Sequence, residues 1–350
     1  MLALVNTSTA QQSVSWPSPE VEQMYKQARE FHSKGNLKQA IMMYKQAIQA
    51  APGIMLLHRE LGQAQYISGD YAEAQNTLQP VIDNGAADEE TYHIMASSQM
   101  SRGDHKKARN TIKAALERYP HSGILYNLSG KMYEANNERP EALQAWLLGI
   151  ENDPGYHINY YDAARAYMDA GVYTWAILYG EMFINIEQQT PRSHDMRKMV
   201  MNSYAKMFQS VEAVKFGKTN APVSGFERAV YNTYIKLSPV VADGFTAENL
   251  TMLRTRFMMD WFTMGYNRRF PFSLFTRHDD MIRNGYFDIY NQWLFGKAEN
   301  PAVYDAWTKF HADAIPEMEE YLKENPYHPG GADFHNNKQV DDLFKKKKKG

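Results

Sequence analysis

The chain has 350 residues, of which 44% are hydrophobic and 22% charged, with a formal net charge of −2 and no cysteine. This composition is that of a globular protein with a core, and it excludes disulfide bonds and thiolate metal sites. A net charge so close to zero provides no overall basic footprint, so we expect no nucleic-acid partner. No apolar run reaches the roughly 18 residues of a membrane span, so we expect no transmembrane segment.

Residues 1–20 are predicted to be a disordered leader or the remnant of a signal peptide. The small residues Thr7–Ala10 resemble the end of a signal peptide. No basic region precedes them, however, and the apolar run Leu2–Val5 is short for a signal peptide. Both interpretations remain open, and the protein is expected to be soluble and either cytoplasmic or exported.

A period of 34 residues dominates the next part of the chain. One alanine recurs at this spacing, as Ala40, Ala74, Ala108, Ala142 and Ala176. Five residues before each alanine stands a residue that tolerates a left-handed backbone: Gly35, Gly69, Gly103, Asn137 and Gly171. The residue after it is mostly polar, and Asn36, Asp70 and Glu138 are predicted to cap the following helix. The columns therefore predict pairs of helices that pack closely at small residues.

This pattern resembles the tetratricopeptide repeat family, whose period is also 34. The units are 21–54, 55–88, 89–122, 123–156 and 157–190, and the fourth matches best, with Tyr126, Gly130, Ala142, Trp146 and Pro154 at the family's positions. Gly180 stands where a large aromatic residue is usual, and Pro80 lies inside a second helix. The resemblance implies an all-α fold, a right-handed superhelical stack of helix-turn-helix repeats over 21–188.

The same resemblance implies a binding surface on the first helix of each unit. In the family the fifth, ninth and twelfth positions of each unit usually face the ligand, and the candidates chosen among them here are Tyr25, Arg29, Arg59, Gln63, His93, Asn127, Lys131, Tyr161 and Arg165. This mixture of cations and tyrosines favours an acidic or amphipathic peptide. The alternatives are a solvated face, or a face filled by the C-terminal half of the chain. The clamp by which some members grip the terminal carboxylate of chaperones is disfavoured, because Glu90 and Lys113 do not reproduce its third unit.

The part after the repeats resembles no family that we recognise. Residues 191–217 are predicted to be two degenerate capping helices, 193–207 and 211–216, because a stack needs an end that covers its last apolar face. After a linker at 218–224, residues 222–326 are predicted to form an aromatic-rich helical domain. Its helices are expected at 224–237, from Thr246, at 273–295, from Asn300 to His311 and from Pro316 to Glu324. Residues 327–350, which end in Lys345–Lys349, are predicted to be disordered.

Several residues in this part have side chains capable of chemistry. The run Arg277–Asp280 contains His278 and two carboxylates, but no second catalytic element accompanies it, and we interpret Asp279 and Asp280 as favourable charges early in a helix. His328, Asp333 and His335 are possible metal ligands in a Gly-rich tail, where we expect no metal site. The aromatic residues between Phe257 and Trp307 are interpreted as core. No catalytic residue, metal or cofactor is therefore predicted.

The leading functional hypothesis is a non-enzymatic scaffold that binds a partner protein or peptide. The alternative is an enzyme or small-ligand protein whose site lies in the C-terminal half, with the repeats as a recruiting arm. Convergent polar groups with perturbed ionisation in a pocket would favour the alternative. A third reading is a repeat array that associates only with itself.

Overall fold

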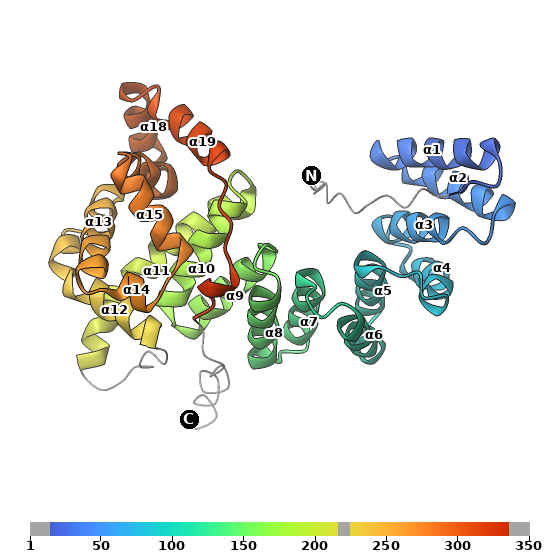
Figure 1. Cartoon of the computed structure of the whole chain (residues 1–350), viewed down its shortest axis with the longest axis horizontal. Helices are drawn as coiled ribbons and strands as arrows, with labels where there is room; N and C mark the ends of the chain where they lie inside the picture. The colour runs from blue at the N-terminus through green and yellow to red at the C-terminus, as the bar shows by residue number, and fades with distance from the viewer. Residues whose placement is uncertain (1–14, 216–224, 336–350) are drawn as a thin grey trace. The chain divides into compact units, whose positions relative to one another are not determined.

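The computed structural model describes residues 15–215 and 225–335, except for the side chains of 210–215. The interpretations of residues 1–14, of the linker 218–224 and of the terminal lysines lie outside the described residues. Every regular element within the described ranges is helical, which confirms the all-α prediction (Figure 1). None of the helices described there is both long enough and apolar enough to cross a membrane.

The chain divides into two compact units, Met1–Ala115 and Leu116–Gly350. The division falls inside helix α6 (His105–Arg118). We call them the first and the second unit, and each is described by itself. The domain boundaries near residues 190 and 217–222 that the sequence suggests stay predictions.

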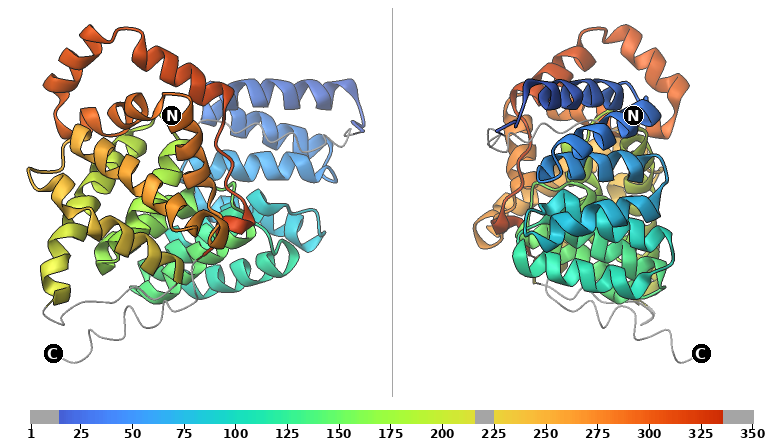
Figure 2. Two further views of the ribbon diagram at one scale, coloured as in Figure 1. Left: turned by 60° about the vertical axis from the view of Figure 1, so that its left-hand side comes forward. Right: turned by 90° about the vertical axis from the view of Figure 1, so that its right-hand side faces the viewer.

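Five helical hairpins occupy the predicted repeats. They are α1–α2 (Pro19–Ser33, Leu37–Ala50), α3–α4 (Met55–Ile67, Tyr71–Asp83), α5–α6 (Glu89–Ser101, His105–Arg118), α7–α8 (Gly123–Ala135, Arg139–Asn152) and α9–α10 (Ile158–Ala170, Tyr173–Ile186). In each compact unit, consecutive hairpins pack against one another, as α2 does against α3 and α8 against α9 (Figure 2). The phased columns of small residues thus predicted both the number and the position of the hairpins.

The turns inside the hairpins have the backbone that the glycine column predicted. Gly35 and Gly171, for example, have φ of 75° and 76°. In the fourth hairpin Asn137 takes this place with φ of 61°, the one non-glycine residue with positive φ in the described ranges. The predicted caps are wrong, because the side chains of Asn36, Asp70 and Glu138 do not cap the helices that follow them. Their backbone carbonyls accept the first helical hydrogen bonds instead.

The alanine column lies in the core. Ala40, Ala74 and Ala108 have no exposed surface, and Ala142 and Ala176 are at most 1% exposed. Opposite this column, a side chain on Gly62 would come within 2.5 Å of Leu78. The hairpin helices therefore approach so closely that only small residues fit where they cross.

The predicted disordered leader is too long by several residues. Helix α1 begins at Pro19, and the hydroxyl of Ser18 accepts a hydrogen bond from the backbone N–H of Val21. Trp16 packs on Tyr25 with ring centroids 4.9 Å apart. An N-cap and a proline in the first turn explain why the helix starts there.

One continuous helix replaces the two predicted capping helices. Helix α11 runs from Pro191 to Lys215 without a break. The chain contains neither glycine nor a second proline between these ends, so nothing interrupts the helix. Buried Met196, Val200 and Tyr204 pack this helix into the core of the second unit.

The remaining helices form the rest of the second unit. They are α12 (Gly225–Lys236), η1 (Ser238–Val241), α13 (Ala247–Thr263), α14 (Tyr266–Arg269), α15 (Ser273–Arg283), α16 (Phe287–Asn291), a π-helical turn η2 (Gln292–Gly296), α17 (Lys297–Glu299), α18 (Pro301–Phe310), α19 (Ala314–Glu324) and η3 (Gly331–Asp333). Thr246 and Asn300 cap α13 and α18 as predicted. The single helix predicted at 273–295 is wrong, because Gly285 with φ of 78° ends it and a new helix starts at Phe287.

The aromatic residues of this part form a core, as predicted. The ring of Phe226 packs against Trp175, Trp261 and Phe272 at centroid distances of 5.5, 5.9 and 5.0 Å. These rings join α10, α12, α13 and the start of α15 into one cluster. Trp307 is the exception, since it lies half-buried on α18, where no residue is buried.

The predicted disordered tail is also too long, because residues 327–335 pack onto the second unit (Figure 1). Tyr327 is buried, and its hydroxyl lies 2.8 Å from the Ser273 hydroxyl. The Asp333 carboxylate accepts hydrogen bonds from Ser273 and from the backbone of Gly330, and the His335 ring stacks on Phe226 at 4.5 Å. Asp333 therefore fixes the end of this segment.

Candidate functional site

First helices of successive hairpins lie next to one another within each compact unit. Helix α3 contacts α5 in the first unit, and α7 contacts α9, which contacts α11, in the second. Most of the predicted binding residues lie on these helices, and Tyr25 and Arg29 lie on α1, the first helix of the first hairpin. We call the surfaces that they form the first-helix faces, one in each unit.

On the face of the first unit, Arg29 is exposed and its guanidinium lies 5.8 Å from the ring of Tyr25. Tyr25 is half-buried, and burial together with the nearby Glu60 raises its pKa. Glu60 in turn accepts a hydrogen bond of 3.3 Å from the hydroxyl of the buried Tyr44. Glu60 was missed by the sequence reasoning, because it stands at none of the fifth, ninth and twelfth positions of its unit. It gives this face an acidic group beside the predicted cation.

Arg59 is already engaged. Its guanidinium pairs with the carboxylate of Asp88, and both side chains are about one-third exposed. The same carboxylate accepts a hydrogen bond of 2.9 Å from the Thr91 backbone and so caps α5. Gln63 and His93 lie half-buried on α3 and α5. Among the predicted residues of this unit, Arg29 is therefore the exposed cation.

The second unit brings four of the predicted residues together around an acid that the sequence reasoning did not select. Asn127 is buried and donates a hydrogen bond of 2.8 Å to Asp162 Oδ2. Arg165 lies 3.9 Å from Asp162 Oδ1 and covers the Tyr161 ring at 5.7 Å. Burial raises the pKa of Asp162, and this effect outweighs the opposite effects of Lys131 and Asn127.

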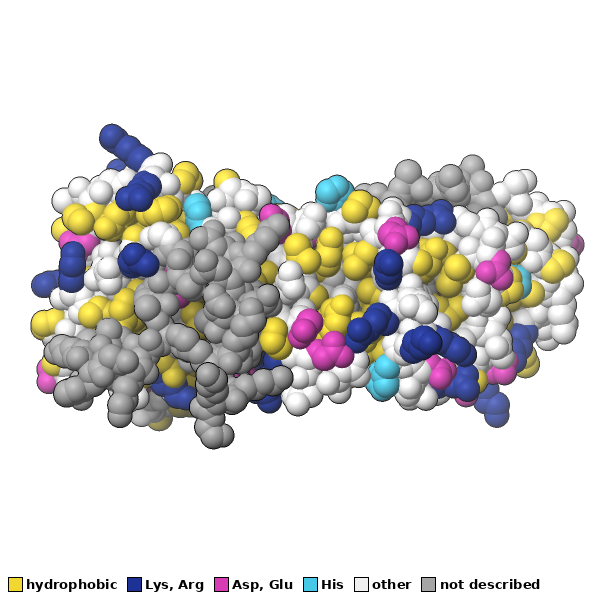
Figure 3. Space-filling view, turned by 90° about the horizontal axis from the view of Figure 1, so that it is seen from below, with side chains coloured by type: hydrophobic (Ala, Val, Ile, Leu, Met, Phe, Trp, Pro, Cys, Tyr) yellow, Lys and Arg dark blue, Asp and Glu magenta, His cyan; other side chains and the backbone are white. Residues whose placement is uncertain are grey.

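This arrangement is suited to anionic or amphipathic ligands. Lys131 and Arg165 are exposed, while Asp162, which compensates them, is only 6% exposed. An arginine next to a tyrosine presents a forked donor together with an apolar ring, a combination that binds carboxylates and peptide segments. The molecule is not uniformly basic, because on the face drawn in Figure 3 the Lys and Arg side chains are interspersed with acidic and hydrophobic ones.

A second cluster of polar groups lies inside the second unit. Glu181 of α10 pairs with Arg254 of α13, and its Oε1 accepts hydrogen bonds from His278 at 2.7 Å and from Tyr290 at 2.8 Å. Burial opposes ionisation of Glu181, but Arg254 and His278 outweigh it and hold the pKa at about 2. Burial likewise lowers the pKa of His278. We call Glu181, Arg254, His278 and Tyr290 the buried network.

The buried network changes the interpretation of Arg277–Asp280. Arg277 and His278 are buried, and Arg277 donates a hydrogen bond of 2.8 Å to the carbonyl of Asn325. Asp279 and Asp280 stand in the second half of α15, so their predicted place early in a helix is wrong. Asp279 instead pairs with Arg283 one turn later. This run therefore holds the C-terminal segment and the buried network in place.

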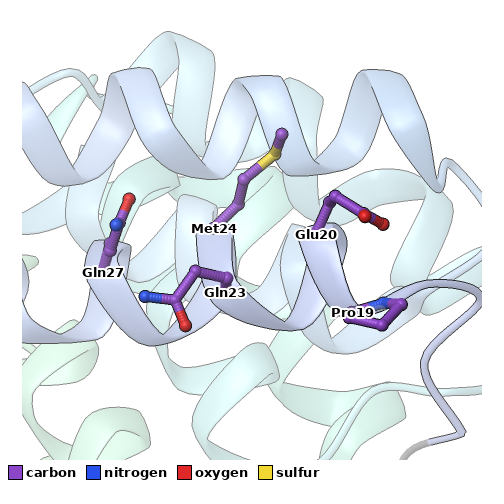
Figure 4. A pocket seen from close by; sticks show the side chains of 5 residues that line it. All are labelled: Pro19, Glu20, Gln23, Met24 and Gln27. Carbon is purple, nitrogen blue, oxygen red and sulfur yellow. The ribbon is translucent and has the colours of Figure 1, made fainter.

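A hollow of about 480 Å³ lies along α1 (Figure 4). Its lining residues come from successive turns of this one helix: Pro19, Glu20, Gln23, Met24 and Gln27. None of the predicted binding residues lines it. The lining is mostly exposed and offers few convergent groups, unlike the enclosed apolar pockets that bind small molecules.

Comparison with known proteins agrees with the repeats. A model of the second ARM domain of tetratricopeptide repeat protein 21 matches residues 19–103, and a tetratricopeptide repeat model matches residues 95–157. A search among curated proteins gives no match.

Similar solved structures include a tetratricopeptide repeat protein from Parabacteroides merdae, with 18% identity, 72% of this chain and 96% of that chain covered, and a TM-score of 0.43. The structure of pilF of Pseudomonas aeruginosa is 12% identical, with 63% of this chain and 91% of that chain covered and a TM-score of 0.46. YrrB, a protein described as having an unusual peptide-binding site, is 16% identical, with 55% of this chain and 90% of that chain covered and a TM-score of 0.36. The two matching models and the phased hairpins lead to one conclusion: residues 19–157 of this chain carry repeats of the tetratricopeptide type.

Proposed function

We propose that the chain is a non-enzymatic scaffold that binds an acidic or amphipathic segment of a partner protein on its first-helix faces. The observation that carries this proposal is the arrangement at Asp162. There the exposed Arg165 lies 3.9 Å from the Asp162 carboxylate and covers the Tyr161 ring, Asn127 donates a hydrogen bond to the same carboxylate, and the exposed Lys131 acts on it electrostatically.

Affinity on such a surface has to come from several contacts. Each exposed ion pair contributes only ~0–1 kcal/mol and is screened by salt. The exposed cations Arg29, Lys131 and Arg165 are the best candidates, because Arg59 is already paired with Asp88. Binding is therefore expected to weaken as the salt concentration rises.

The test begins with affinity capture of partners from the native host by the full chain, with identification by mass spectrometry. A captured partner is then titrated by calorimetry against the wild type and against a variant with Arg29→Ala, Lys131→Ala and Arg165→Ala. If the three contacts act together, the variant should bind about tenfold to a hundredfold more weakly at low salt.

A matched control has the same change of charge on the second helices. Lys45, Lys106 and Arg139 are exposed there, and their replacement by alanine should leave affinity unchanged. Equal affinity of the first variant and the wild type, at low and high salt alike, would place the binding surface elsewhere.

The alternative of an enzyme in the C-terminal half has one observation in its favour. The buried network contains convergent polar groups with perturbed pKa values, as an active site often does. However, the side chains of Glu181, Arg254 and His278 are at most 3% exposed and bind one another. A substrate would have to displace these contacts, so a structural role for the network is the simpler reading.

A further inference from the structure

Helix α18 displays an apolar face that joins no hydrophobic core within the described residues. Its residues Pro301–Phe310 are all at least partly exposed, and the exposed fractions of Val303 and Phe310 reach 60% and 87%. The apolar side chains share one face of the helix: Ala302, Val303, Ala306, Trp307 and Phe310. We call this set the α18 stripe.

The spacing of the α18 stripe is that of a helix packed against a partner. Its members follow one another at i, i+1, i+4, i+5 and i+8, which aligns them along a single side of a helix. Local contacts hold the two ends of the helix, and only one of them involves a member of the stripe. Asn300 caps the N-terminus, and His311 stacks on Trp307 at 4.3 Å near the C-terminus.

One edge of the stripe carries two opposite charges. Asp305 and Lys309 lie one turn apart beside Ala302 and Ala306, and both are exposed. Neither side chain forms an ion pair with any residue in the described part of the chain. The helix thus presents an apolar surface bordered by one acid and one base.

These features are self-complementary under a two-fold rotation. Two such helices can pack antiparallel about a two-fold axis that passes near Trp307. The edge that carries the charges then lies on the same side of both helices, and the two edges run in opposite directions. Asp305 of one copy then comes opposite Lys309 of the second copy, and this pair occurs twice. The large Phe310 meets the opposite half of the stripe, where the small alanines leave room.

We propose that the α18 stripe is a self-association surface whose occupant is α18 of a second copy of this chain. This proposal does not rest on peptide binding by the first-helix faces. A helix of ten residues offers less than the ~800 Å² per partner of a standard interface, so the dimer is expected to be weak. Its dissociation constant should lie in the micromolar range or above.

The first measurement is sedimentation of the full chain from about 1 µM to about 300 µM, the range in which small interfaces dissociate. The mean mass of the wild type should rise with concentration. Phe310→Glu should raise the dissociation constant by about tenfold or more, because a charge would have to be buried against the apolar side chains of the second copy. A wild type that stays monomeric throughout would overturn the proposal.

A charge exchange tests the orientation of the two copies. Asp305→Lys and Lys309→Asp should each weaken the dimer by about two- to tenfold, since like charges then face each other twice. The double variant restores both pairs and should return to wild-type affinity. Failure of the double variant to recover would exclude this antiparallel pairing.

The control substitution is Met259→Glu, which places the same charge on another exposed apolar residue of the second unit. It should leave the dissociation constant unchanged, and an effect as large as that of Phe310→Glu would contradict the assignment to α18. Circular dichroism checks that all variants fold. Phe310-dependent binding to phosphatidylcholine vesicles by a protein that does not self-associate would assign the stripe to a membrane surface and overturn the proposal.

Discussion

Glu181 accepts hydrogen bonds from His278 and Tyr290 and pairs with Arg254, although its side chain is only 1% exposed. A buried ion pair adds little stability compared with apolar residues, but an unpaired buried charge costs about 3–5 kcal/mol. The three partners come from α13, α15 and α16, which are distant from α10 in sequence. The network therefore favours one specific arrangement of these helices.

The histidine of this network predicts a dependence of stability on pH. Burial and the neighbouring Arg254 hold the pKa of His278 below its usual value, against the effect of Glu181. The unfolded chain therefore takes up the proton first as the pH falls. The free energy of unfolding therefore contains a contribution from the neutral His278 that is fully present above the pKa of histidine in the unfolded chain, about 6.5. As the pH falls further, this contribution is lost by up to ~1.4 kcal/mol per pH unit, until the pH reaches the pKa of His278 in the folded protein.

His278→Gln isolates this effect, because glutamine can donate a hydrogen bond to Glu181 but does not titrate. Urea unfolding at pH 7 and pH 5 should show a smaller loss of stability in this variant than in the wild type. The exposed His311→Gln variant is the control and should lose as much as the wild type. Equal losses in all three proteins would mean that folding does not lower the pKa of His278.

At the scale of single elements, Gly180 determines how closely α10 and α11 approach. A side-chain carbon at this position would lie 2.6 Å from Val200 Cγ2 and 3.0 Å from Met196 Sδ, both on α11. The aromatic residue that is usual here in the family has no room. The departure of Gly180 from the family pattern thus follows from the close packing of α11 against α10.

Gly180→Ala distinguishes packing from helix propensity by the sign of its effect. Propensity alone predicts stabilisation of about 1 kcal/mol, whereas overlap with Val200 predicts a loss of about 1–3 kcal/mol. We expect the loss, measured by urea unfolding with tryptophan fluorescence. Adding Val200→Ala should cost less in the Gly180→Ala background than in the wild type, because the two side chains compete for one space. A more stable single variant would contradict the close approach.

At the scale of the molecule, the second unit joins the end of the repeats to all the helices that follow. Trp175 of α10 donates a hydrogen bond of 2.9 Å to the buried Glu227 of α12. Arg197 of α11 donates one of 3.2 Å to the carbonyl of Trp293 and covers its ring at 4.0 Å. These contacts, together with the buried network, dock α12–α17 onto α10 and α11.

This docking predicts that a cut between α11 and α12 leaves the protein in one piece. Residues 218–224 are replaced by a site for a sequence-specific protease, and the full chain is cleaved. Both fragments should elute together in native size-exclusion chromatography and separate in denaturant. Glu181→Lys, which places a cation beside Arg254, should release them after cleavage. Separation of the unmutated fragments under native conditions would contradict the docked arrangement.

The local periodicity of the sequence was enough to predict the hairpins. The glycines in the turns and the alanines where the helices cross determine the structure of their own repeat. They can therefore be interpreted without knowledge of contacts between distant parts of the chain. The same reasoning located the caps Thr246 and Asn300. The same reasoning failed at α11, which is one continuous helix because its sequence contains no residue that would interrupt it. It also failed at Gly285, where a single glycine ends a helix inside an apolar pattern.

The sequence by itself determined the helical class, the register of the repeats and the set of side chains on the first helices. Only the tertiary structure decided which of these side chains remain available to a ligand. Arg59 forms an ion pair with Asp88 of the next hairpin, and Asn127 donates a hydrogen bond to Asp162. The tertiary structure also assigned His278 to Glu181, 97 residues earlier in the chain. Pairing of buried charges depends on distances between elements remote in sequence, and no local spacing encodes those distances.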